Sequence, residues 1–221
     1  MLRNLKLFLP LALLLVAALS YGQEEELFVY GVIKDVESLK KMNAVKVDVY
    51  QNGDVFDTFT TTSNGRYEFT MPLGFNYQIK FSSGEYVTKK VQFDTRNIPD
   101  EDKRGGFKSN MDMTLFGNVE GFDTSILDQP IGKASFNPIE NSIDFDFDYT
   151  SRVQKLIDNE FERLDNLGDE LTKLRENFEE EMEKGDQRMS GKKFSEAVTR
   201  FERAIGIAID LTEADVDLAE A

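Results

Sequence analysis

The sequence of 221 residues predicts a β-sandwich followed by an all-helical segment. Between Leu27 and Phe116, apolar and polar residues alternate with a period of two, and turn residues separate the runs. Short alternating runs bounded by turn residues are typical of sandwiches and barrels. After Thr150 the apolar residues instead recur every seven positions, which indicates helices packed along a seam.

Seven short antiparallel strands in two packed sheets are expected in the first part. Asn52-Gly53 predicts a tight hairpin turn, because both residue types tolerate the positive φ angles that such a turn requires. Ser63-Asn64-Gly65 predicts the next turn. The expected strands cover residues 27–34, 44–51, 54–62, 66–71, 75–82, 86–94 and 110–116.

The alternation also assigns a direction to the side chains of these strands. Val45, Val47 and Val49 are expected to point into the core, with Lys46 and Asp48 on the solvent side. Further core rows with the same spacing are Phe75, Tyr77, Ile79 and Phe81, then Val87, Val91 and Phe93, and then Met111, Met113 and Leu115.

Four short motifs in these strands resemble the carboxypeptidase regulatory-like domain. They are Gly31-Val32-Ile33, Ala44-Val45-Lys46-Val47, the segment Thr61-Thr62-Ser63-Asn64-Gly65-Arg66-Tyr67-Glu68-Phe69, and Tyr77-Gln78-Ile79, in the family's order. The resemblance implies a seven-stranded, prealbumin-like sandwich that serves as an accessory module without peptidase chemistry. Residues 129–133 and 148–150 also resemble the segment after this sandwich in exported proteins of the phylum Bacteroidota.

The residue types present exclude several functions. The chain has no histidine and no cysteine, so it offers no Ser-His or Cys-His relay, no disulfide and few of the usual zinc ligands. The net charge of −15 opposes binding to nucleic acid, which depends on cationic side chains that neutralise phosphates. We therefore expect a non-enzymatic protein without a cofactor, a metal or a nucleic-acid partner.

Residues 1–22 are expected to be a secretory signal peptide. Arg3 and Lys6 precede a mostly apolar run, and Ser20 and Gly22 are the small residues that a signal peptidase requires. The run is short for a membrane-spanning helix and contains Pro10. The mature protein is thus expected in the periplasm or at the periphery of the outer membrane, without a transmembrane anchor.

Residues 118–150 are expected to form an acidic linker between a sandwich at 23–117 and a helical segment at 151–221. This stretch is rich in glycine, asparagine, aspartate and proline. Asp144, Asp146 and Asp148 alternate as in the start of a calcium loop, but Tyr149 and Lys155 occupy the positions where that loop needs glycine and glutamate. A short strand with its acids in water is the alternative that remains.

The helical segment carries a stripe of apolar residues that needs a partner. Thr150 or Ser151 is the expected N-cap, and Gly168 is the expected weak point of the first helix. A helix with one apolar face is stable only when that face is covered, by later helices or by another chain. The heptad positions, predicted as partner-binding residues, are Ile157, Leu164, Leu171 and Phe178.

A second pattern near the C-terminus resembles the tetratricopeptide repeat. Its residues are Gly185, Phe194, Ala197, Phe201 and Ala204, with residues 190–193 as the turn between two helices. The resemblance implies close packing of two antiparallel helices, because the small residues admit the aromatic ones. Arg188 departs from the pattern, since an aromatic residue is usual there, and a plain helical hairpin remains the alternative.

Together these features favour an exported, non-enzymatic binding or scaffold protein of the cell envelope, in which the helices dock a protein partner or self-associate. One alternative is a carbohydrate-binding or carboxylate-based hydrolytic protein, because glutamates are abundant and other catalytic groups are scarce. The other alternative is a structural envelope subunit that oligomerises through the heptad stripe.

Overall fold

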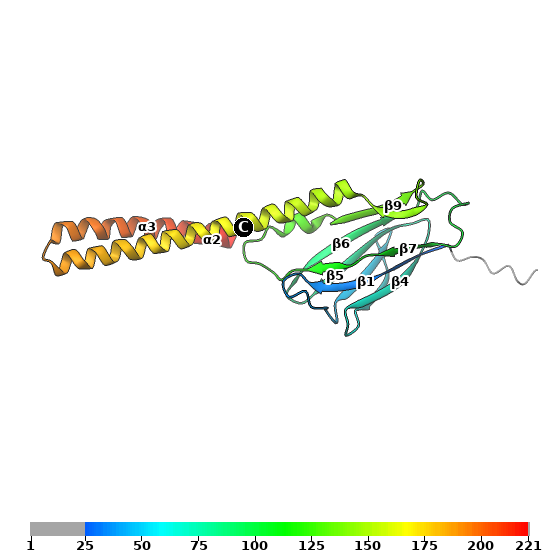
Figure 1. The fold of residues 1–221 in the computed structure, drawn as a ribbon, viewed down its shortest axis with the longest axis horizontal. Helices are drawn as coiled ribbons and strands as arrows, with labels where there is room; N and C mark the ends of the chain where they lie inside the picture. The colour runs from blue at the N-terminus through cyan, green and yellow to red at the C-terminus, as the bar shows by residue number, and fades with distance from the viewer. Residues whose placement is uncertain (1–24, 221) are drawn as a thin grey trace, which may run out of the picture.

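The computed structural model describes residues 25–220, so the predicted signal peptide at 1–22 lies outside the described residues. A β-sandwich occupies one end of the molecule, and a pair of long antiparallel helices projects from it (Figure 1). None of the helices in this range has a stretch that is both long and apolar enough to cross a membrane.

The described residues form ten strands. Their bounds are β1 (Glu26–Asp35), β2 (Lys46–Gln51), β3 (Asp54–Thr60), β4 (Arg66–Pro72), β5 (Asn76–Ser83), β6 (Tyr86–Asp94), β7 (Phe107–Asn110), β8 (Met113–Leu115), β9 (Gly132–Asn137) and β10 (Ser142–Phe145). One sheet has the order β4-β1-β7, with β8 also paired to β1, and the other has the order β10-β9-β6-β5-β2-β3. The sandwich is confirmed, whereas the strand number differs from the expected seven.

Three strand pairings are parallel, which the expectation of a purely antiparallel sandwich missed. Strands β7 and β8 both run parallel to β1, and β9 runs parallel to β6. Antiparallel neighbours can be joined by short turns, but parallel neighbours are joined by long connections that leave little local signal in a sequence. The hairpin at Asn52-Gly53 is confirmed, with φ angles of 52° and 101°.

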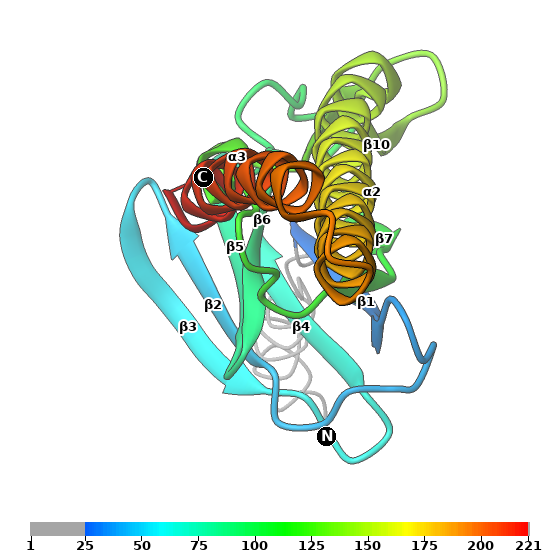
Figure 2. The ribbon, with the colours of Figure 1, turned by 90° about the vertical axis from the view of Figure 1, so that its left-hand side faces the viewer.

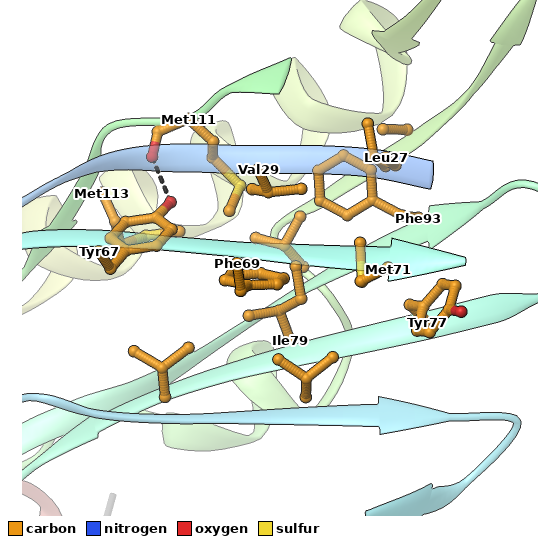
Figure 3. Packing of buried hydrophobic residues seen from close by; sticks show 14 of the residues in the cluster. Leu27, Val29, Tyr67, Phe69, Met71, Tyr77, Ile79, Phe93, Met111 and Met113 are labelled. Atoms are coloured by element: carbon orange, nitrogen blue, oxygen red, sulfur yellow. Dashed lines mark hydrogen bonds between the residues drawn. The ribbon is translucent and has the colours of Figure 1, made fainter. Parts of the chain in front are cut away.

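The last expected strand is divided in two by Met111 and Asp112. The carboxylate of Asp112 accepts the N–H of Val32 at 2.9 Å, where a strand residue would otherwise pair. Next to this point the chain passes close to Gly31, where a Cβ atom would lie 2.1 Å from the carbonyl oxygen of Met111. The hydroxyl of Tyr67 donates to the same carbonyl (Figure 3). Only glycine therefore fits at position 31, because the backbone of Met111 leaves no room for a side chain.

The expected acidic linker contains two strands of the larger sheet. Its residues 132–137 and 142–145 form the β9–β10 hairpin, which extends the sheet beyond β6. Ala134 and Ile143 are buried in the core, and Phe145 packs edge-on against Phe93 with ring centroids 5.4 Å apart. The expected strand around Asp144 is thus present only as far as Phe145, because Asp146 caps α2 and the rest of the alternating stretch, from Phe147, is helical.

The main core lies between the two sheets and contains the expected apolar rows (Figure 3). Val45, Val47 and Val49 are fully buried. Two residues of the expected rows lie outside this core: Phe75 precedes β5 and keeps 36% of its surface exposed, and Val87 is buried in a separate cluster.

Asp48 is buried, which corrects its expected position in solvent. It is 5% exposed, accepts a hydrogen bond from Thr58 at 2.8 Å, and pairs with Lys46 at 2.9 Å. Burial raises its pKa, but the hydrogen bonds from Lys46 and Thr58 outweigh this, so the pKa is lower than usual. The alternation correctly assigned Asp48 to the outer face, but these neighbours cover it there.

Two helices follow the sandwich: α2 (Phe147–Ser190) and α3 (Phe194–Glu220). The N-cap of α2 is Asp146, whose carboxylate accepts the N–H of Tyr149 at 2.9 Å, so the helix begins earlier than the expected cap at Thr150 or Ser151. The first half of α2 lies against the sandwich and the second half pairs with α3, as Figures 1 and 2 show.

A separate apolar cluster joins the first half of α2 to the sandwich. It contains residues from the start of β6 and from the segment after β8, including the short 3-10 helix η1 (Thr124–Asp128). The buried members are Val87, Phe116, Phe122, Leu127, Val153 and Ile157.

An ionic contact between a buried carboxylate and an exposed arginine lies beside this cluster. Glu160 is only 8% exposed and accepts the N–H of Asp123 at 2.9 Å and two bonds from Arg163 at 2.7 and 3.0 Å. Arg163 also donates to the carbonyl oxygen of Gly121. The contact therefore ties α2 to the loop that follows β8.

Glu160→Gln is predicted to destabilise the protein near neutral pH by about 1–2 kcal/mol, because a charged acceptor forms stronger hydrogen bonds than an amide oxygen. The bonds from Arg163 hold the pKa of Glu160 below its usual 4.5. The stabilisation is therefore present above pH 4.5 and lost as the pH falls through the lowered value. Urea melts across this range, with the exposed Glu162→Gln as control, should show a difference that disappears in acid. A pH-independent difference would contradict this role.

Candidate protein-binding surface on the helical hairpin

The heptad residues predicted to bind a partner do not share one surface, because different parts of the same chain pack against them. Ile157 is buried against the sandwich, and Leu164 packs against the same cluster. Leu171 is buried at 6% exposure. Only Phe178, which is half-buried, lines an open groove. The structure thus does not bring the four residues together on one free face.

The pair of helices packs around the small residues that the repeat-like pattern identified. Ala197 and Ala204 are buried, and the ring of Phe201 lies directly over Gly185. A Cβ atom on Gly185 would lie 2.4 Å from that ring, so any larger residue at this position would force the ring of Phe201 to move. Phe194 is the exception: it is the first residue of α3 and 59% exposed, and the prediction that it packs between the helices is wrong.

Ion pairs along one side of the hairpin hold its register. Arg200 donates to both carboxylate oxygens of Glu181, at 2.9 and 3.0 Å, and these bonds lower the pKa of Glu181. Near the turn, Arg188 lies 3.3 Å from Glu196. The Arg188–Glu196 pair is exposed, and such pairs contribute little to stability, whereas the Glu181–Arg200 pair is partly buried. Both pairs join α2 to α3 and so favour one alignment of the two helices.

The other side of the hairpin carries an apolar groove of about 720 Å³. Three of its side chains are large and exposed: Met182 at 37%, Ile205 at 61% and Ile209 at 55%. A contiguous exposed apolar surface on a helix pair commonly marks a site of interaction. The lining residues are Phe178, Met182, Phe201, Ala204, Ile205, Ala208, Ile209, Thr212 and Glu213.

Ile205 and Ile209 were not predicted from the sequence as candidates for binding. The sequence signal that could have identified them is the width of the apolar face of α3. Beside the buried Ala197 and Ala204, this face also includes the exposed residues Val198, Ile205 and Ile209. One antiparallel partner covers only part of a stripe so wide. The uncovered part is the groove.

A second hollow lies on the sandwich, between the edge strands β3 and β4. Its volume is about 480 Å³, and it is lined by Phe59, Tyr67 and mostly polar residues of the turn between the strands. Burial raises the pKa of Tyr67, and its hydroxyl already donates to Met111. Tyr67 is therefore held in its neutral form, which does not suit it to act as a base.

The sequence matches no protein-family model and no curated protein. Solved structures with some likeness include the Bacillus anthracis TIE protein (16% identity, TM-score 0.34, 42% of this chain and 17% of that one). Others are catechol 1,2-dioxygenase from Acinetobacter (16%, 0.35, 50% and 59%) and BcpA, the major pilin subunit of Bacillus cereus (15%, 0.31, 42% and 30%). The chain spans less than two thirds of each of the three, and scores of this size leave function to be inferred from its own residues.

Two glycines of α2 give a matched test of the hairpin. Gly185→Ala should destabilise the hairpin by about 1–3 kcal/mol or more, because the new methyl group would overlap the ring of Phe201. Gly168→Ala should instead stabilise the helix by up to about 1 kcal/mol, since Gly168 has open space around its Cα atom. Thermal melts followed by circular dichroism at 222 nm would measure both. Equal effects of the two substitutions would contradict the packing described here.

Proposed function

We propose that the chain is an exported, non-enzymatic binding protein whose helical hairpin docks a protein partner while the sandwich serves as a rigid mount. The observation that carries this proposal is the apolar groove between α2 and α3, with Ile205 and Ile209 more than half exposed. The continuous helix α2 extends beyond the sandwich to the part where it pairs with α3 (Figure 1), and the groove lies on this pair. A partner can therefore reach the groove without contacting the sheets.

The sequence resemblances support the same division of roles. The carboxypeptidase regulatory-like motifs fit an accessory, prealbumin-like module, and the packing of Gly185, Ala197, Phe201 and Ala204 fits a tetratricopeptide-like hairpin used for interaction. The pattern of residues 1–22 supports a location in the periplasm or at the outer-membrane periphery.

Photo-crosslinking in the native cells tests the docking directly. A photoreactive amino acid at Ile205 is expected to form adducts with another protein, because this side chain lies in the groove. The same amino acid at Asp158, an exposed position on the docked half of α2, should form none and serves as control. Adducts only between two copies of the chain would favour a self-associating envelope subunit, and equal adducts at both positions would refute docking in the groove.

Glycan binding is a second candidate, favoured by the hollow between β3 and β4. Phe59 supplies an aromatic surface there, and Arg66 and Asn64 supply polar groups, a combination suited to sugars. Binding of a soluble oligosaccharide that Arg66→Ala abolishes would support this candidate.

A further inference from the structure

We infer that the groove on the hairpin takes an amphipathic helix whose apolar face is flanked by lysine or arginine. This inference rests on the proposed function and specifies the chemistry of the partner. It follows from the shape of the groove, from the charges along its rim and from the contrast with the opposite side of the same hairpin.

The shape of the groove fits a helix. On α3 the lining residues Phe201, Ile205, Ala208 and Thr212 recur at intervals of three and four, so they form a straight stripe along the helix. The stripe covers about three turns, or roughly 16 Å, from the rise of 1.5 Å per residue. A two-helix floor of this kind accepts a third helix whose apolar residues have matching spacing.

The rim of the groove is acidic on both sides. Glu202 lies three residues before the groove residue Ile205, and Glu213, four residues after Ile209, is itself one of the lining residues. Both glutamates therefore lie beside the apolar residues that α3 contributes to the groove. On α2, Asp186 lies four residues after Met182 in the same way. All three carboxylates are on exposed residues. A helix that enters the groove would place its flanking residues beside them.

The one base near this edge of α2, Arg175, is already paired with Asp215 at 3.6 Å. The hollow on the opposite side of the hairpin, of about 410 Å³, is lined by Arg203 and by three acids, Glu180, Glu181 and Asp210. Its two glutamates are already paired, Glu180 with Lys184 and Glu181 with Arg200. The combination of apolar floor and acidic rim is thus confined to one side of the hairpin, and opposite charge on the partner would complement it.

The same rim opposes occupation of the groove by a second copy of the chain. A twofold interface places the same patch on both subunits, so the acidic rims would meet each other. Like charges across an interface are unfavourable, and the chain as a whole carries a net charge of −15. A basic helix from a different protein avoids both costs.

Two synthetic helical peptides test the inference on the purified protein. Both carry leucines along one face; one has lysine on its flanks and the other has glutamate. Fluorescence anisotropy should show that the lysine peptide binds about tenfold or more tightly than the glutamate peptide at low salt, with the difference shrinking in high salt. Ile205→Glu should abolish binding of both peptides, while its unfolding transition confirms that the sandwich remains folded.

A pair of double variants with equal change in charge gives the matched control. Glu202→Gln with Glu213→Gln, on the rim, should remove most of the preference for lysine. Glu180→Gln with Asp210→Asn, at the opposite hollow, should leave it intact. Equal effects of the two variants, or equal affinity for the two peptides, would overturn the inference.

The remaining outcomes separate this inference from the proposed function. If neither peptide binds while Ile205 still crosslinks to another protein, the inference fails and the proposed function stands. If Ile205 crosslinks to no other protein, the docking proposal fails as well. A stable dimer that Ile205→Glu dissociates would assign the groove to a second copy and also overturn the inference.

Discussion

The contact between the first half of α2 and the sandwich determines the rest of the architecture. A helix of 44 residues with one apolar face needs tertiary partners along its length. Val153 and Ile157 pack into the cluster around Phe116 and Phe122, and the buried carboxylate of Glu160 adds polar contacts beside it. This leaves the second half of α2 beyond the sandwich, where α3 covers it.

This arrangement explains why an apolar groove persists in a protein that is otherwise strongly charged. The sandwich covers one part of the α2 stripe, and α3 covers another, but no element in the described residues covers the outer side of Phe178 and Met182. Large exposed apolar side chains such as Ile205 are a liability in solution unless they serve an interaction. The acidic rim lowers that liability, because it disfavours unspecific contact between copies of the chain.

The sequence predicted the sandwich well wherever residues alternate and turns are local. The rows around Val47, Ile79 and Phe93 are buried as expected, and the Asn52-Gly53 hairpin is present. The pairing of β9 with β6 was missed because β9 reaches this neighbour across a long connection in parallel register, which no local pattern reveals. The role of Gly31 depends on the approach of Met111, which is far away in the chain, and could not be inferred from its surroundings in sequence.

The candidate site was predicted less well, for a related reason. The heptad pattern identified Ile157, Leu164, Leu171 and Phe178 as residues that need burial, but periodicity alone does not say which surface covers them. The packing of the small residues Gly185 and Ala197 was easier to predict, because small residues at this spacing in two helices indicate that the helices pack closely. Ile205 emerges as a binding residue only after the covered and uncovered sides of α3 are distinguished.

If the first half of α2 is docked as described, α2 holds the hairpin rigidly on the sandwich, and a distance measured between the two parts tests this docking. Because the chain contains no cysteine, spin labels can be attached at Thr70→Cys on β4 and Ser195→Cys near the start of α3 without further changes. Double electron–electron resonance should give one narrow distance distribution, since a continuous docked helix connects the two sites. A broad or two-peaked distribution would show that the hairpin moves relative to the sandwich, and would contradict a rigid mount.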